Sequence, residues 1–131
     1  MKLTVPIEDL VIGIICGLLL IGYSERFFSL KLNDFVYVIA FMIYAVFIVL
    51  DTLYEFSDLT THFGFIVLSI THNVVDLVLS AAIITHFSKW NIPFITEYAV
   101  PYLQGEQVLF ILGAFFVLGN VFWLVVYPFT Y

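Results

Sequence analysis

Charged side chains are scarce in this sequence: four Lys and Arg and ten Asp and Glu make up 11% of its 131 residues. Soluble proteins carry about 25% charged residues, so this scarcity argues against a water-soluble domain. The shortage of basic residues also excludes a nucleic-acid-binding surface, which needs a stripe of positive charge. The single cysteine, Cys16, excludes an intramolecular disulfide, and we interpret it as a small buried apolar side chain.

Apolar residues take the place of the missing charges: the sequence is 63% hydrophobic, with a mean hydropathy of +1.13. A helix needs about 20 residues to cross the hydrocarbon core of a bilayer. Four such segments fit, at about 8–28, 35–56, 63–87 and 108–129. We therefore predict an all-α membrane protein, a single polytopic domain over residues 1–131, in which four transmembrane helices form a compact bundle in the lipid bilayer.

The connection between the third and fourth predicted helices is aromatic and weakly charged. It contains Trp90, Phe94, Tyr98 and Tyr102. Such rings settle at the level of the lipid headgroups. We expect this linker to lie at the membrane interface or to pack on another protein chain.

The basic residues predict an orientation. Arg26, Lys31 and Lys89 lie in the connections after the first and third predicted helices, and the remaining one, Lys2, is near the N-terminus. Connections rich in Lys and Arg usually face the cytoplasm. Both termini are therefore predicted to lie outside the cytoplasm.

Small residues indicate where helices approach closely. Gly13 and Gly17 form a small-xxx-small pattern in the first helix, and Gly113, Ala114 and Gly119 recur in the fourth. Lipid tails are as apolar as leucine, so membrane helices associate through close packing and hydrogen bonds. We interpret this pattern as packing within the chain rather than as a dimer interface.

The third predicted helix is the most polar. At 100° per residue, Ser69, His72, Asp76, Ser80 and Ile83 fall on one face. His72 and Asp76 are four residues apart and can contact each other. Ionisable groups are costly inside a membrane and tend to be kept for a purpose, so this face is predicted to point into the bundle or at a partner subunit.

A deep cluster is predicted around this pair, comprising His72, Asn73 and Asp76, with Tyr44 and Asn120 from neighbouring helices. A tight turn between the second and third predicted helices would bring His72 towards Tyr44. Asp76 is expected to be the one charged residue that cannot reach an interface or a connection. Three roles are open: a hydrogen-bonded pair that fixes helix register, a proton or ion relay near neutral pH, or part of a metal or cofactor site.

A second cluster is predicted near the connection between the second and third helices. Asp51, Glu55 and Asp58 share one helix face, and His62 would lie beside Glu55 across the turn. Carboxylates with a histidine suit a transition metal such as zinc, iron or copper. The alternative is a solvated acidic turn.

Haem is disfavoured. His72 and His86 are separated by fourteen residues, or about 21 Å along a helix axis, and cannot bind one haem together. Two stacked haems would need further axial ligands from a second copy of the chain. The identity of any cofactor stays open.

The sequence lacks a glycine-rich phosphate loop, a Ser/His/Asp arrangement, a CxxC motif and an HExxH motif, so it does not predict an enzyme acting on its own. The leading hypothesis is a small integral subunit that packs within a larger membrane complex or homo-oligomer, scaffolds its helices and contributes the His72/Asp76 site. One alternative is a homo-oligomeric proton- or ion-coupled transporter or channel that uses Asp76 and His72. Another is a metal- or haem-binding component of a membrane oxidoreductase.

Overall fold

The computed structural model describes residues 4–57, 63–103 and 105–130. Its long elements are α1 Thr4–Ser24, α2 Asp34–Ser57, α3 Phe63–Ser88 and α4 Glu106–Thr130. Two short helices, the π-helix η1 (Ile95–Ala99) and the 3-10 helix η2 (Val100–Leu103), lie between α3 and α4. These ranges contain helices and no strand, so the prediction of an all-α protein is confirmed.

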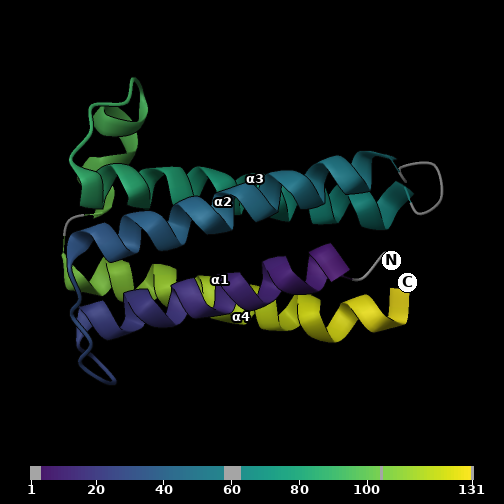
Figure 1. Ribbon diagram of the computed structural model, residues 1–131, viewed down its shortest axis with the longest axis horizontal. Coiled ribbons are helices and arrows are strands. Elements are labelled where there is room, and N and C mark those ends of the chain that lie inside the picture. The colour runs from purple at the N-terminus through teal and green to yellow at the C-terminus, as the bar shows by residue number, and fades with distance from the viewer. Residues whose placement is uncertain (1–3, 58–62, 104, 131) are drawn as a thin grey trace.

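The four long helices lie side by side along the long axis of the molecule (Figure 1). α1 packs most extensively on α4 and α2 on α3, and contacts between α1 and α2 join the two pairs. The start of α1, the end of α2, the start of α3 and the end of α4 meet at one end of the bundle, which we call the terminal end (Figure 1). The opposite end, which carries residues 25–33, η1 and η2, is called the loop end.

The first helix is displaced from its predicted position. α1 begins at Thr4 and ends at Ser24, whereas residues 8–28 were predicted. Glu25 adopts a left-handed φ of 61°. The backbone N–H groups of Glu25 and Leu30 both donate to the Gly22 carbonyl, at 3.2 and 3.0 Å. This turn ends the helix before residue 26, so the predicted extension to residue 28 was wrong.

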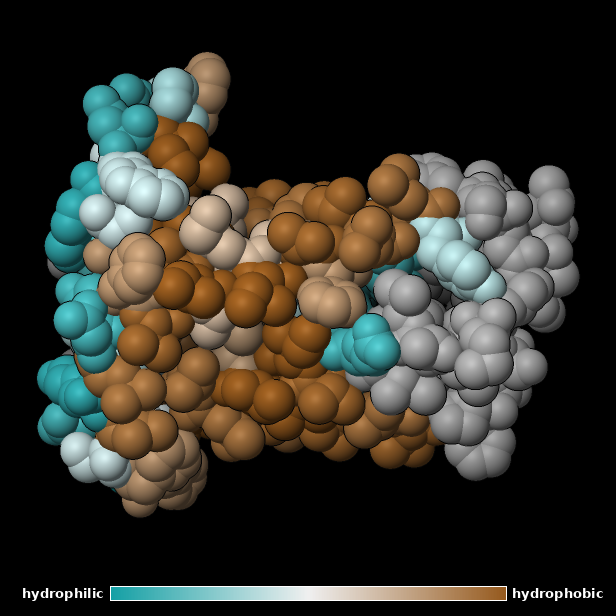
Figure 2. All heavy atoms as spheres, in the orientation of Figure 1, coloured by the Kyte–Doolittle hydropathy of each residue, from teal (hydrophilic) through white to brown (hydrophobic). Residues whose placement is uncertain are grey.

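Within the described residues, three of the long helices contain segments that are long and apolar enough to cross a membrane: Asp34–Tyr54, Val67–Ser88 and Gln107–Val125. On the face shown in Figure 2, hydrophobic side chains cover the middle of the molecule and hydrophilic ones gather at the loop end. This pattern is compatible with a multi-pass membrane protein, because apolar side chains around the middle of a bundle can face lipid tails.

Glycines allow α1 and α4 to pack closely. A Cβ atom at Gly17 would lie 2.7 Å from the carbonyl oxygen of Gly113, and one at Gly113 would lie 2.7 Å from the carbonyl oxygen of Gly17. Each helix therefore presents bare backbone to the other, as expected where membrane helices associate through small residues. The small-residue pattern serves packing within the chain, as predicted.

Aromatic rings fill the half of the core towards the loop end. Tyr23, Tyr37 and Phe87 pack together with ring centroids 4.7–5.2 Å apart. Deeper in the bundle, Phe41 packs on Phe116 at 5.5 Å. Among the described side chains, the packed rings of the core lie between the middle of the bundle and the loop end, while Asp9, Asp51 and Asn73 are buried in the other half.

Candidate functional site

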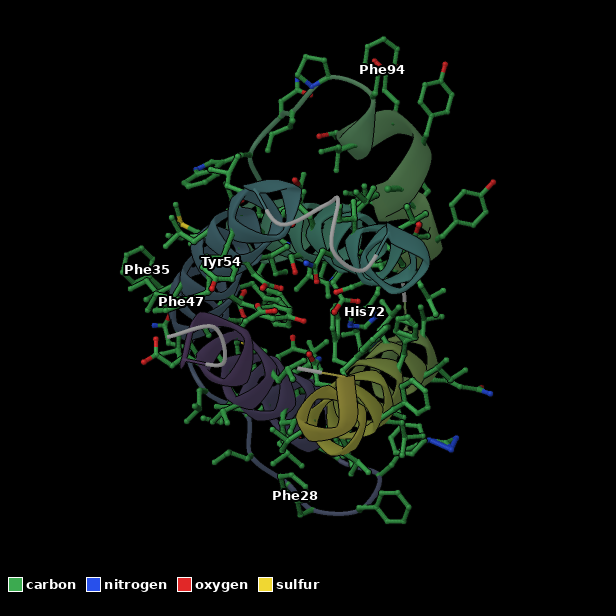
Figure 3. All side chains as sticks on the ribbon, turned by 90° about the vertical axis from the view of Figure 1, so that its right-hand side faces the viewer. Phe28, Phe35, Phe47, Tyr54, His72 and Phe94 are labelled. Carbon is green, nitrogen blue, oxygen red and sulfur yellow. The ribbon has the colours of Figure 1, made fainter. Side chains whose placement is uncertain are left out.

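The polar face of α3 points into the bundle, as its periodicity predicts. Ser69, Asp76 and Ser80 are at most 2% exposed, and the side chain of His72 is 15% exposed. Seen from the terminal end, His72 lies in the interior between α3 and α4, whereas Phe94 points outwards (Figure 3). A regular helix is enough to explain this, because residues three and four apart fall on the same side.

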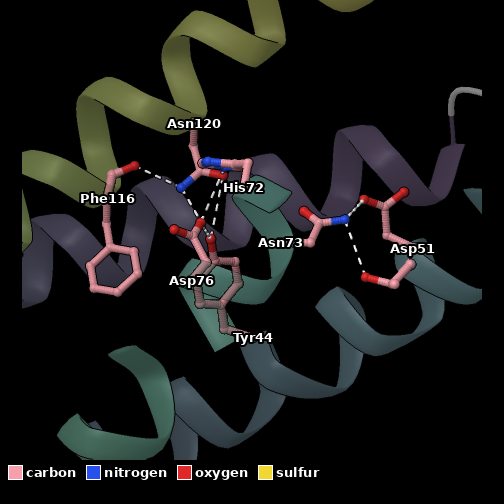
Figure 4. Close-up of polar contacts among 8 residues, drawn as sticks. Tyr44, Asp51, His72, Asn73, Asp76, Phe116 and Asn120 are labelled. Carbon is pink, nitrogen blue, oxygen red and sulfur yellow. Dashed lines mark hydrogen bonds and ion pairs between the residues drawn. The ribbon is translucent and has the colours of Figure 1, made fainter. Parts of the chain in front are cut away.

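Three helices contribute to the hydrogen bonds around Asp76. The Tyr44 hydroxyl of α2 donates to Asp76 Oδ2 at 2.5 Å, across to α3 (Figure 4). Asn120 of α4 donates through its Nδ2 to the Tyr44 hydroxyl oxygen at 3.2 Å and to the carbonyl of Phe116 at 2.6 Å. Tyr44 and Asn120 are fully buried. The structure thus brings together Tyr44, Asp76 and Asn120, which were predicted to share the deep cluster.

His72 completes this group from the same helix as Asp76. Its Nε2 atom lies 3.2 Å from Asp76 Oδ2, within ion-pair distance but outside the geometry of a hydrogen bond. The imidazole packs on the Trp123 ring, with centroids 5.8 Å apart. A Cβ at Gly119 would lie 3.3 Å from His72 Cε1, so this glycine leaves room for the imidazole. We call Tyr44, His72, Asp76 and Asn120 the Asp76 site.

One side of the Asp76 site has unused hydrogen-bonding capacity. Asp76 Oδ1 and Ser80 Oγ are both buried and make no hydrogen bond within the described part of the chain. They belong to the same face of α3, one helical turn apart. An ionised carboxylate can accept several hydrogen bonds. Asp76 therefore retains an oxygen that could accept a proton or bind a water molecule.

Asn73 belongs to a neighbouring contact rather than to the Asp76 site. Its Nδ2 atom donates to Asp51 Oδ2 at 2.9 Å and to Thr52 Oγ1 at 3.3 Å, both on α2 (Figure 4). Placing Asn73 in one deep cluster with Asp76 was therefore inexact. On a helix, consecutive residues such as His72 and Asn73 point about 100° apart, so Asn73 reaches α2 while His72 faces α4.

The predicted metal cluster is described only in part. Asp51 is 2% exposed and accepts a hydrogen bond from Asn73, so it lies within the bundle rather than on a solvated turn. Asp58, His62 and the side chain of Glu55 lie outside the described residues. Among the side chains that the structure does describe, no three of His, Cys, Asp or Glu gather as a metal-ligand set.

A third buried acid, Asp9 of α1, was not anticipated. It is 1% exposed and lies one turn before Gly13 on α1. A Cβ at Gly13 would lie 2.7 Å from Asn120 Cγ and 2.8 Å from Tyr44 Cζ, so this face of α1 covers the Asp76 site. The expectation that Asp76 alone would be kept from an interface was therefore wrong. The signal available in the sequence was the four-residue spacing between Asp9 and Gly13.

The arrangement at Asp76 is suited to exchanging a proton. The imidazole of His72 and the phenol of Tyr44 both approach the same carboxylate oxygen, Asp76 Oδ2. A pair formed by a histidine and a carboxylate can exchange a proton near neutral pH. The amide of Asn120 fixes the phenol without titrating. All of these groups come from one chain.

Comparisons with known proteins assign no identity to the chain. No protein-family model matches the sequence, and neither a curated protein nor a solved structure matches it. The function therefore has to be inferred from the geometry of the Asp76 site and from the apolar surface that surrounds it.

Proposed function

We propose that this protein is a small multi-pass membrane protein that conducts protons, or couples proton movement to transport, through Asp76 and His72. The observation that carries the proposal is a carboxylate buried at the middle of the bundle, with an imidazole 3.2 Å from one oxygen and no hydrogen bond in the described structure to the other. Intramembrane ionisable residues commonly mark ion and proton pathways.

A purely structural role explains this site less well. Asn, Ser and Tyr can fix helix register with neutral hydrogen bonds, and Asn120 and Tyr44 already do so here. Burying an ionisable group adds a desolvation cost that a neutral side chain avoids. Asp76 and His72 together are therefore better explained by proton exchange than by packing.

The proposal includes α1 as a fourth membrane span. With 21 residues, α1 has the length that a span needs. Of its two acidic residues, Asp9 is buried in the bundle and so does not face lipid, whereas Glu8 is exposed near the start of the helix. With the basic residues Arg26, Lys31 and Lys89 at the loop end, the positive-inside tendency places that end in the cytoplasm and both termini outside it.

The test is proton flux into liposomes that contain the purified chain and a trapped pH-sensitive dye, driven by a potassium diffusion potential. The wild type should acidify the lumen faster than protein-free liposomes. Asp76→Asn should reduce the rate to the protein-free level, and His72→Gln should slow it. Asp34→Asn, the same change at an exposed acid on α2, should leave the rate unchanged.

The folded state of each variant is checked by its helical circular dichroism and its resistance to unfolding by SDS. A wild type with no flux above protein-free liposomes would overturn the proposal. So would a folded Asp76→Asn variant that conducts like the wild type. If Asp76→Asn does not fold, His72→Gln carries the test alone.

A second candidate function is that of a subunit in a larger membrane assembly, with the aromatic linker as its docking surface. Phe94, Tyr98 and Tyr102 are 65–77% exposed. Solubilisation in a mild detergent should then recover other chains in a fixed ratio to this one. Recovery of this chain alone would count against the subunit function without affecting the test of proton flux.

A further inference from the structure

A cavity of about 250 Å³ lies where α3 leaves the bundle and the chain folds back through η1 and η2. It is lined by Thr85, His86, Lys89, Trp90, Thr96 and Val100. Thr96 holds the loop over this cavity: its hydroxyl accepts from the Ile92 N–H at 2.8 Å and donates to the Trp90 carbonyl at 3.3 Å. The cavity is thus built from a helix end and a loop that its own hydrogen bonds fix in place.

Among the described basic residues, Lys89 is the one whose charge has no partner within the described part of the chain. Arg26 lies over the Phe110 ring at 5.6 Å. Lys31 lies 3.7 Å from Glu25 Oε1 and 5.0 Å from the centre of the Tyr23 ring. Within the described ranges, Lys89 makes no ion pair and covers no aromatic ring. Its ammonium is therefore available to an anion.

The backbone conformation of Lys89 also favours a role for this residue in binding an anion. Lys89 has a left-handed φ of 64° directly after the end of α3, a position that glycine usually takes. A side chain there costs backbone energy that glycine would avoid. Strained residues of this kind often belong to ligand sites.

Other groups in the cavity suit the same ligand. The Trp90 indole N–H is a donor, and the His86 ring can donate as well. Among the described residues, no carboxylate lines the cavity. The site therefore offers one fixed positive charge and neutral donors, which match an oxyanion with a single negative charge.

We propose that this cavity binds the phosphate of an anionic phospholipid headgroup, with Lys89 as the charged ligand and Trp90 as a neutral donor. The cavity lies at the loop end, next to the exposed rings of Phe94 and Tyr98, where aromatic side chains meet the headgroup region. Basic pockets at the cytoplasmic ends of membrane helices bind such headgroups. The inference does not depend on proton transport through Asp76.

The test uses the delipidated full chain in detergent, titrated with short-chain phosphatidylglycerol or phosphatidylcholine and followed by native mass spectrometry. The wild type should bind one phosphatidylglycerol more tightly than phosphatidylcholine. One basic residue near a membrane surface corresponds to about a fivefold change in affinity, so Lys89→Gln should weaken phosphatidylglycerol binding about fivefold.

Two further variants test whether lipid binding depends on the charge at Lys89 in particular. Lys89→Arg should bind like the wild type, because it keeps the charge on the same left-handed backbone. Lys31→Gln removes a basic residue from the same end of the bundle and should also bind like the wild type. Equal weakening by Lys31→Gln and Lys89→Gln would overturn the site, because it would indicate general charge attraction.

The remaining outcomes separate the sources of the anion. Equal binding of phosphatidylcholine and phosphatidylglycerol would overturn the charge argument. Displacement of phosphatidylglycerol by inorganic phosphate at equal concentration would assign the cavity to a free anion instead of a lipid. A stable complex with another protein at this end, lost in Lys89→Gln, would replace the lipid by a protein partner.

Discussion

Removing the Tyr44 hydroxyl tests how strongly the Asp76 site holds the bundle together. Tyr44→Phe keeps the buried ring but deletes the hydrogen bond to Asp76 Oδ2 at 2.5 Å and the one from Asn120 Nδ2 at 3.2 Å. In soluble proteins a hydrogen bond to a charged group contributes about 1.5–3 kcal/mol and a neutral one about 0.5–1.5 kcal/mol. Within membranes the measured values average about 0.6 kcal/mol and reach about 1.7 kcal/mol.

The short bond to Asp76 belongs at the upper membrane value and the longer bond from Asn120 near the average. Together they predict that Tyr44→Phe lowers the free energy of unfolding by about 2 kcal/mol, which raises the unfolded-to-folded ratio about 30-fold. The measurement is unfolding by SDS in mixed micelles, followed by circular dichroism.

Tyr23→Phe is the matched control. Tyr23 also packs in a buried ring cluster, with Tyr37 and Phe87, but its hydroxyl makes no hydrogen bond within the described ranges. We expect it to change stability by less than about 0.5 kcal/mol, because the ring packing is kept and no hydrogen bond is removed. If Tyr44→Phe costs no more than Tyr23→Phe, the hydrogen bonds at Asp76 do not stabilise the fold and the reasoning fails.

The remaining predictions concern two glycines of α1. Gly13→Ala places a Cβ 2.7 Å from Asn120 Cγ and 2.8 Å from Tyr44 Cζ, so we expect it to displace the Asn120 amide and to slow proton flux in liposomes. Gly17→Ala places a Cβ 2.7 Å from the Gly113 carbonyl oxygen, which is backbone and cannot rotate away. We expect it to separate α1 from α4 and to destabilise the protein by about 1–3 kcal/mol in SDS unfolding; unchanged stability would contradict the close crossing of these helices.

Helix type and buried faces could be predicted from the sequence because they depend on local periodicity. Tyr37, Tyr44 and Asp51 recur every seven residues, and all three are buried on one side of α2. On α3, the spacing of Asp76 and Ser80 likewise placed both residues inside the bundle. A regular helix of about 3.6 residues per turn is sufficient for this inference, whatever the neighbouring helices do.

The register between helices could not be predicted in the same way. A tight turn after α2 was expected to bring His72 towards Tyr44, yet the Tyr44 hydroxyl bonds to Asp76, one helical turn further along α3. Register depends on how side chains of different size interlock across the whole interface. The hydrogen bond between Asp51 and Asn73 is displaced in the same direction from the expected pairing, by about one further helical turn, so the displacement is not confined to one contact.

Asp9 shows that an error in the predicted start of a helix changes whether a residue is expected at an interface or inside the bundle. A helix predicted to begin near residue 8 leaves Asp9 at an interface, where an acid is unremarkable. α1 instead begins at Thr4, which places Asp9 within the helix, on the buried side that also carries Gly13 and Cys16. Hydropathy reports which residues are apolar and does not fix the residue at which a helix begins, so the acidic pair Glu8 and Asp9 hid the first turn of α1.

The described core side chains differ on the two sides of Asp76, and this difference bears on the proposed proton exchange. Towards the terminal end, the described buried side chains include those of Asp9, Asp51 and Asn73. Towards the loop end lie the packed rings of Tyr37 and Phe87, with centroids 4.7 Å apart. The described buried polar side chains on this side include the neutral Ser24, Ser80 and Thr85, and a charge that passed between them would be desolvated among apolar atoms. Under the proposed function, we therefore expect a proton to reach Asp76 more easily from the terminal end, where the described buried side chains include the acids Asp9 and Asp51, than from the loop end.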